Sequence, residues 1–413
     1  MKSEWAEEIN WWLKPPFHSK EQTQQLKLTS EHKKHAEPKP GHFRLRGPAG
    51  SGKTLIVAYR AAKLASQGNK VLVVNFNITL WHYIKDMIAR TPFNKFDLRG
   101  NISLNHFHGF CKDVLNELDV PSPAIETYFK DISSTVKYAF KTANKRGENV
   151  DHLKYDAILI DEGQDYEWEW YDCLREFLTE RDELLLVCDK KQNIYKRNLN
   201  WTDEVFSTQW RELKTVHRLP KKIGDAANEF SKLFGLDQSL EVEDLEYVQL
   251  KLFELKPHLV WKNIQIKDWR DHIKDAYEQI KAEQIKSGGG HPSDITILFP
   301  NREIGISAVK HFEKQNIRVN HVFEDECERE YHRHKKSFWV GDGRLKMSTF
   351  HSFKGWEARH VILLIPNKWM GDENLDSLVY TSMTRTLENL IVLNCNERYV
   401  EFGKTLPSEW DNQ

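Results

Sequence analysis

Short apolar runs recur along the chain, and a helix-forming stretch follows most of them. The runs are Val71–Phe76, Ala157–Asp161, Leu184–Asp189, Ile295–Phe299, Arg344–Thr349, Val361–Pro366 and Leu390–Asn394. Unbroken apolar runs of this kind are typical of strands buried on both faces of a parallel sheet. Because these strands alternate with helices, the pattern predicts an α/β fold with parallel sheets flanked by helices.

The same pattern divides the chain into an arm and two larger parts. We expect an N-terminal helical arm at residues 1–27, a first domain at residues 28–220 and a second domain at residues 221–413. Residues 85–150 are mostly helical in pattern and look like a small insertion in the first domain. The arm contains Trp11 and Trp12, and a docking helix and a partner-binding segment both remain open for it.

A glycine-rich octet, GPAGSGKT, follows an expected strand at residues 42–45 and precedes an expected helix from Thr54 to Ala65. Loops of the form G-x-x-x-x-G-K-[ST] wrap their backbone N–H groups around phosphates, and the helix dipole favours the anion. The octet therefore predicts ATP and Mg²⁺ as cofactors, with Lys53 on the β/γ-phosphates and Thr54 on the metal. The alternative is a glycine-rich turn that binds nothing. The candidate ATP-binding residues of the octet are Gly47, Pro48, Ala49, Gly50, Ser51, Gly52, Lys53 and Thr54.

A second candidate motif, ILIDEGQD at residues 158–165, ends a buried strand in carboxylates. Phosphoryl transfer needs an acid at a strand tip to hold Mg²⁺ and a neighbouring base to orient the attacking water. Asp161 fits the first role and Glu162 the second. Alone, such a strand end is as readily a solvated terminus, but its position downstream of the phosphate loop favours the catalytic interpretation.

The composition bears on the cellular compartment and on how charged ligands are held, but it does not distinguish between functions. The chain has 413 residues, 39% hydrophobic content and a formal charge of −1, so any polyanion must be held by local patches. No apolar run reaches about 18 residues, so no membrane segment is expected. Scattered cysteines without a C-x-x-C pair make disulfides and structural zinc unexpected and favour a cytoplasmic setting. A metal site at Cys327, His332 and His334 is less favoured than a solvated charge run.

With both nucleotide motifs placed, the chain resembles UvrD/Rep-type superfamily 1 helicases over about residues 28–395. The resemblance is carried by further strings in the family's order, namely residues 74–80 (VNFNITL), 105–110 (NHFHGF), 161–165 (DEGQD), 188–195 (CDKKQNIY), 215–218 (TVHR), 348–357 (STFHSFKGWE) and 379–386 (VYTSMTRT). It implies two RecA-like domains, here without the large insertion that the family carries in its second domain.

The resemblance also implies residue roles. Catalytic roles fall on Glu162, Lys53, Gln192, Arg218 and Arg385, where Gln192 senses the γ-phosphate and the two arginines neutralise charge on the transferred group. Asp161 joins Thr54 in the Mg²⁺ site. Glu357 corresponds to the ribose contact, and His32 and His217 take the places where the family binds adenine. The candidate nucleic-acid contacts, each of which is otherwise a core residue, are Phe76, Asn77, His108, Tyr195, Arg197 and His351.

The resemblance implies an ATP-dependent translocase or helicase on single-stranded nucleic acid, with DNA favoured. An alternative is an ATP-dependent sensor or regulatory subunit that licenses a partner protein, such as a nuclease in a genome-defence or repair complex. The short second domain, the Trp-rich arm and Arg197, which stands where the family has an aromatic platform, motivate this alternative. A small-molecule kinase would need none of the later motifs.

Overall fold

A computed structural model describes residues 25–93, 100–124, 127–189, 192, 194–195, 197–216, 219–236, 246–247, 257–287, 290–324, 333–339, 341–369, 371 and 374–409. The predictions for residues 1–24, for His217 and Arg218, and for Cys327 and His332 therefore lie outside the described residues. The described chain divides into two compact units. The first comprises residues 25–47 and 52–213, and the second comprises residues 48–51 together with the described residues from Lys214 onward.

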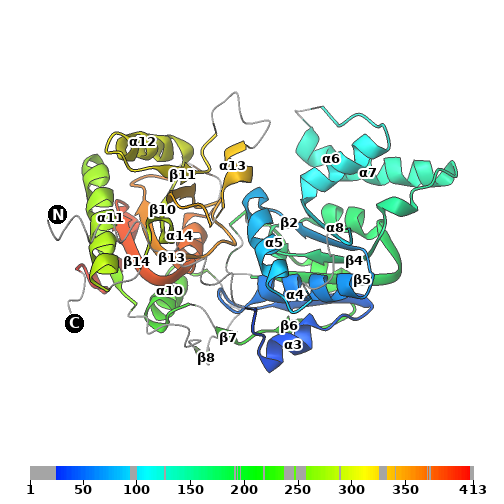
Figure 1. Ribbon diagram of the computed structural model, residues 1–413, viewed down its shortest axis with the longest axis horizontal. Helices are drawn as coiled ribbons and strands as arrows, with labels where there is room; N and C mark the ends of the chain where they lie inside the picture. Colours follow the sequence, from blue (N-terminus) through cyan, green and yellow to red (C-terminus); the bar gives the residue numbers. More distant parts are fainter. Residues whose placement is uncertain are drawn as a thin grey trace, which may run out of the picture. The chain divides into compact units, whose positions relative to one another are not determined.

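The first unit is built on a parallel sheet of six strands in the order β3-β2-β4-β5-β1-β6 (Figure 1). All five residues of β2 are buried, as are the last six of β5, which is the burial that the apolar runs predict. The strands are β1 (Gly41–Arg46), β2 (Val71–Asn75), β3 (Ile102–His106), β4 (Tyr155–Ile160), β5 (Leu178–Cys188) and β6 (Arg211–Glu212).

Helices cover both faces of this sheet. Right-handed crossovers place α4 and α5 on one face and α6, α7 and α8 on the other, because the chain moves in opposite directions across the sheet in the two stretches. An aromatic-rich core fills the space under α6–α8. The helices are α3 (Ser30–Ala36), α4 (Lys53–Ser66), η1 (Ile78–Leu80), α5 (Trp81–Ala89), α6 (Phe107–Glu117), α7 (Tyr128–Lys145), η2 (Asp151–Leu153), η3 (Gly163–Asp165), α8 (Trp168–Arg175) and α9 (Trp201–Val205).

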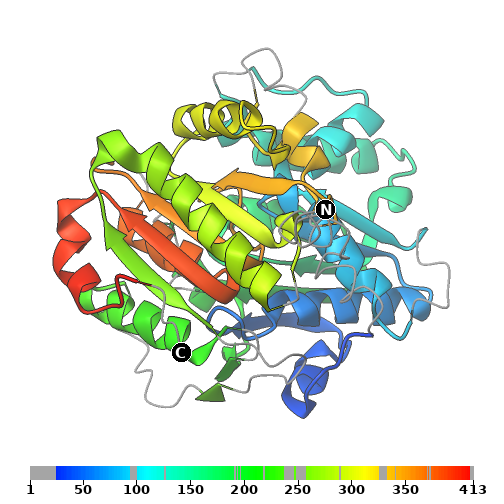
Figure 2. The ribbon, with the colours of Figure 1, turned by 60° about the vertical axis from the view of Figure 1, so that its left-hand side comes forward.

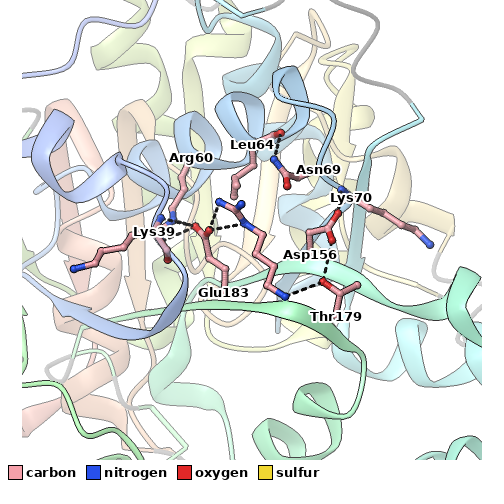
Figure 3. Close-up of polar contacts among 9 residues, drawn as sticks. Lys39, Arg60, Leu64, Asn69, Lys70, Asp156, Thr179 and Glu183 are labelled. Atoms are coloured by element: carbon pink, nitrogen blue, oxygen red, sulfur yellow. Dashed lines mark hydrogen bonds and ion pairs between the residues drawn. The ribbon is translucent and has the colours of Figure 1, made fainter.

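A buried ion-pair network holds α4 to the amino end of the sheet (Figure 3). Arg60 donates from Nε and Nη2 to Glu183 Oε1 at 2.9 and 2.6 Å, and both side chains are fully buried. Arg181 pairs with the other carboxylate oxygen at 2.8 Å, and the Lys39 N–H donates to Oε1 at 3.1 Å. Because Glu183 pairs with Gly41 at the start of β1, the network lies at the opposite end of that strand from the glycine-rich octet.

The second unit is built on another parallel sheet of six strands, in the order β11-β12-β10-β13-β14-β9. All five residues of β10 are buried, and so are the last six of β13. The strands are β9 (Leu259–Asn263), β10 (Ile295–Phe299), β11 (Val319–His321), β12 (Leu345–Thr349), β13 (Ala358–Ile365) and β14 (Thr386–Asn394), and a separate short ladder joins β7 (Thr215–Val216) to β8 (Glu246–Tyr247).

In this unit α11 runs across the sheet against β13 and β14, as Figure 2 shows, and α12 packs over β10, β11 and β12. Helix α14 contacts β13 and β14 and packs against α10. The helices are α10 (Lys221–Leu233), η5 (Ile266–Asp268), α11 (Trp269–Lys286), η6 (Pro292–Asp294), α12 (Arg302–Glu313), α13 (Arg333–Ser337), α14 (Leu375–Met383), η8 (Glu397–Tyr399) and α15 (Val400–Lys404). Two parallel sheets flanked by helices confirm the predicted α/β class and are consistent with two RecA-like domains.

Candidate active site

The glycine-rich octet forms the turn between β1 and α4. Gly50 and Gly52 have φ values of 72° and 85°, a left-handed conformation that glycine adopts without a Cβ penalty. A Cβ atom at Gly52 would lie 2.8 Å from Nε2 of His32, so the buried imidazole fills the space beside this glycine. The structure thus places His32, the candidate adenine contact, directly against the phosphate loop.

Lys53 begins α4 and folds back over the octet. Its Nζ donates to the Gly47 carbonyl at 2.8 Å and lies 3.5 Å from the Asp189 carboxylate. The Gly47 N–H in turn donates to the carbonyl of Cys188 at the end of β5, at 3.3 Å. These contacts fix the ammonium group beside the N-terminus of α4, where the helix dipole and the backbone N–H groups favour a phosphate.

Thr54 and Asp161 come together as the predicted metal site requires. The Thr54 hydroxyl donates to Asp161 Oδ2 at 2.9 Å, and Asp161 Oδ1 accepts the Glu162 N–H at 3.0 Å. Burial, followed by the charge of Glu162, raises the pKa of Asp161 to about 7. Hydroxyl and carboxylate oxygens are the ligands that Mg²⁺ prefers, and a divalent cation would offset the cost of burying this carboxylate charge. The residues present therefore fit a Mg²⁺ ion held by Thr54 and Asp161.

Glu162 has a strained backbone. Its φ of 54° places a non-glycine residue in the left-handed region, which costs on the order of 1–3 kcal/mol and is found preferentially at functional sites. The residue is 6% exposed, and its carboxylate accepts a hydrogen bond from Gln164 Nε2. Gln164 Oε1 accepts the Asp189 N–H at 2.9 Å, so this side chain ties the end of β4 to the end of β5.

Asp189 is the centre of a continuous polar network. Gln192 Nε2 donates to Asp189 Oδ2 at 2.8 Å, the same oxygen that faces Lys53. The network therefore runs from Glu162 through Gln164 and Asp189 to both Gln192 and Lys53. Neither Gln164 nor Asp189 had a predicted role, although both lie inside motif strings that carry the resemblance. The structure brings together five predicted residues of the nucleotide site, namely Lys53, Thr54, Asp161, Glu162 and Gln192.

Two further candidates of the nucleotide site, Arg385 and Glu357, belong to the second unit. Arg385 follows α14 in the second unit, where Nε donates to the Thr381 carbonyl at 3.1 Å and Nη2 to the Thr384 hydroxyl at 3.4 Å. Arg385 is 6% exposed. Glu357 is partly buried in the loop that precedes β13. Their roles, and those of His217 and Arg218, stay predictions.

Four of the six nucleic-acid candidates meet around a residue that sequence reasoning missed, Trp170. Phe76 lies parallel to Trp170 with ring centres 5.8 Å apart, and Tyr195 meets Phe76 edge-on at 5.1 Å. The His108 ring meets Trp170 edge-on at 4.9 Å, and the Arg197 guanidinium lies 4.5 Å from the centre of the Trp170 ring. We call Phe76, His108, Trp170, Tyr195 and Arg197 the Trp170 cluster.

The Trp170 cluster stands at the carboxyl edge of the first sheet. Its members follow the ends of β2, β3, β4 and β5, which are neighbours in the sheet. Ligands bind to open α/β sheets at this edge, where the strand ends converge. Burial, followed by the charge of Arg197, lowers the pKa of His108 to about 4, so the ring is neutral at physiological pH.

The other two nucleic-acid candidates have different surroundings. The Asn77 side chain caps η1 by accepting the Thr79 N–H at 3.2 Å and the Thr79 hydroxyl at 3.0 Å, which gives it a structural role. His351, in the second unit, lies nearly parallel to Trp369, with ring centres 6.1 Å apart and 19° between the planes. Within the described ranges, no three His, Cys, Asp or Glu side chains are grouped as metal ligands.

Comparison with known proteins gives a match within residues that lie mostly in the first unit. Residues 35–198 match the family model of an AAA domain, a match that includes the octet, Asp161, Glu162 and Gln192. The match supports a P-loop nucleotide-binding fold for this segment, and with it an enzyme that hydrolyses nucleoside triphosphates and binds them with Mg²⁺. No curated protein matches the chain. Over the residues that the structure describes, no helix combines the length and apolar character needed to cross a bilayer.

Proposed function

We propose that the protein is an ATP-driven translocase or helicase that acts on single-stranded nucleic acid, DNA being favoured. One observation carries the proposal: the polar network around Asp189 and the Trp170 cluster are built from the same two segments of chain, those that follow β4 and β5. Glu162 and Trp170 both follow β4, and Gln192 and Arg197 both follow β5. A change at the γ-phosphate therefore has a short covalent route to the residues that would hold a strand.

The chemistry of each group fits this role. Lys53, Thr54 and Asp161 would hold the triphosphate and Mg²⁺, and Glu162 would orient the attacking water. Arg385 of the second unit would contribute charge during hydrolysis. Aromatic rings and a guanidinium beside one another are the side chains that stack unpaired bases without reading sequence, as a motor on a single strand requires.

The test is ATP hydrolysis in the presence and absence of single-stranded DNA and RNA oligonucleotides. We expect stimulation by a single strand, and a Glu162→Gln variant should bind ATP and the strand but stall. Glu401→Gln, which alters an exposed ion pair with Lys404 on α15, is the matched control and should behave as wild type. A wild-type rate that no polynucleotide changes would refute the proposal.

A regulatory ATPase that licenses a partner protein is the second candidate. The observation that favours it is the position of Arg197, whose guanidinium lies within the Trp170 cluster where the resemblance calls for a free aromatic platform. A strand-displacement assay separates the two functions. Stimulated hydrolysis without unwinding or directional movement would favour the regulatory role, whereas unwinding by the isolated chain would favour the motor.

A further inference from the structure

Arg197 covers the indole of Trp170. The guanidinium carbon lies 4.5 Å from the centre of the Trp170 ring, 5.5 Å from that of Phe76 and 5.8 Å from that of Tyr195. Its Nη1 atom is also 3.2 Å from the carboxylate of Glu167. Three aromatic rings and one carboxylate thus surround a planar cation whose side chain is 17% exposed.

Trp170 is the inner member of a stack. Phe107, which is fully buried, lies parallel to Trp170 with ring centres 4.6 Å apart and 10° between the planes. Trp170 itself is 3% exposed, whereas Phe76, Tyr195 and Arg197 are only partly buried. The core therefore supports the indole from Phe107, and the partly exposed members of the cluster separate it from solvent.

We infer that Arg197 is a plug. It occupies the place that an unpaired base takes on Trp170, and a single strand uncovers Trp170 by displacing the guanidinium. Trp170 is then a base-stacking residue that is hidden until a strand binds. The inference rests on the proposed function, because it requires a single-stranded polynucleotide as ligand.

The exchange of the Arg197 guanidinium for a base on the Trp170 indole replaces one stacking contact with another. A base and a guanidinium are both planar groups that stack on an indole, and base stacking on an aromatic ring is the stronger of the two contacts at a partly exposed site. The displaced guanidinium turns outward into water, where it stays charged and hydrated. Glu167 loses its partner at little cost because its side chain is 48% exposed.

The first test is the affinity of a fluorescent single-stranded oligothymidylate, measured by anisotropy over a series of salt concentrations and compared between proteins at the same salt. We expect Arg197→Ala to bind about tenfold more tightly than wild type, which corresponds to about 1.4 kcal/mol. Arg197→Lys, which lacks a planar head, should fall between them. Arg175→Ala is the matched control, because Arg175 is an exposed residue of α8 that stacks on Tyr171 outside the cluster, 5.7 Å from its ring centre.

The second test is photocrosslinking with a strand that carries 5-iododeoxyuridine, followed by mass spectrometry of the peptides. We expect a crosslink at Trp170 in wild type and a stronger one in Arg197→Ala. Tighter binding of the variant without a crosslink at Trp170 would overturn the inference. So would unchanged affinity, or weaker binding with a salt dependence shallower by about one ion, which would make Arg197 an ordinary phosphate contact.

The outcomes also separate this inference from the proposed function. If wild type binds the strand and hydrolyses ATP faster with it, while Arg197→Ala binds no more tightly, only the plug is wrong. If Arg197→Ala binds a strand that wild type does not, the strand does not displace Arg197 from the wild-type protein and the inference is wrong as stated. If neither protein binds any single strand, the proposed function fails and the plug fails with it.

Discussion

Gly163→Ala tests whether close packing behind the carboxylates shapes the active site. Gly163 follows Glu162 and begins η3. A Cβ atom there would lie 2.5 Å from Leu186 Cδ1, 2.9 Å from Leu186 Cγ and 3.0 Å from the Val187 carbonyl oxygen. Real Cβ contacts are not shorter than about 3 Å, and Leu186 is fully buried in β5, so neither side can move without disturbing the core.

The expected cost follows from overpacking. One methyl group forced into a close-packed interior destabilises by about 1–3 kcal/mol. For a unit of this size that lowers the melting temperature by about 3–9 °C, at about 3 °C per kcal/mol. Glu162 would shift with its neighbour; under its proposed role of orienting the attacking water, a displacement of about 1 Å should lower kcat by up to about 100-fold.

Thermal unfolding and steady-state hydrolysis of ATP measure the two effects. Gly100→Ala is the matched control, because a Cβ at Gly100 has no neighbour within 4 Å. Leu186→Ala makes room for the new methyl group, so the double variant Gly163→Ala/Leu186→Ala should lose less stability than the sum of the two single changes. A Gly163→Ala protein with the melting temperature and turnover of wild type would show that the contact does not constrain the site.

Three further predictions follow from the described contacts. Lys53→Ala should abolish ATP binding in a titration with a fluorescent nucleotide, since it removes the cation beside Asp189, whereas Lys63→Ala on the same helix should bind normally. Glu183→Gln should destabilise the protein by about 3–5 kcal/mol in chemical denaturation, because it leaves the fully buried Arg60 without its charged partner; unchanged stability would contradict this. Burial, followed by the charge of Arg197, lowers the pKa of His108 to about 4 in the folded protein, whereas the same imidazole is protonated near pH 6.5 in the unfolded chain. The stability that the neutral ring contributes is therefore complete above about pH 6.5. It falls by at most about 3 kcal/mol as the pH drops toward 4. His108→Asn should therefore flatten the melting temperature over that pH range, and parallel curves for the two proteins would rule the effect out.

The central strands were predictable because both of their faces are buried. The apolar runs that predict strands coincide with β2, β4, β5, β10, β12, β13 and β14. The strands that the pattern did not reveal include β3, whose five residues are all only partly buried, and the two-residue edge strand β6. Such strands are defined by hydrogen bonds to a neighbour, which a hydrophobicity pattern does not record.

The nucleotide motifs were predictable for a related reason: their geometry is local. The octet has glycine at positions 50 and 52, where the backbone takes a positive φ, and Asp161 directly follows an apolar run that predicts β4. The Trp170 cluster is different, because its members follow four strands whose adjacency depends on the order of the sheet. From the sequence alone Trp170 is one of 14 tryptophans, and a buried tryptophan is most often a core residue.

Tyr166 is the physical link between the two groups. It is fully buried, its N–H donates to the Gly163 carbonyl at 3.1 Å, and its ring meets Trp170 edge-on with centres 5.6 Å apart. Because interiors are close-packed, a shift of the strained backbone at Glu162 has to be taken up by this ring or passed to Trp170. The residue that would orient water and the indole that would stack a base are thus linked through Tyr166, whose backbone N–H bonds the turn after Glu162 and whose ring packs against Trp170.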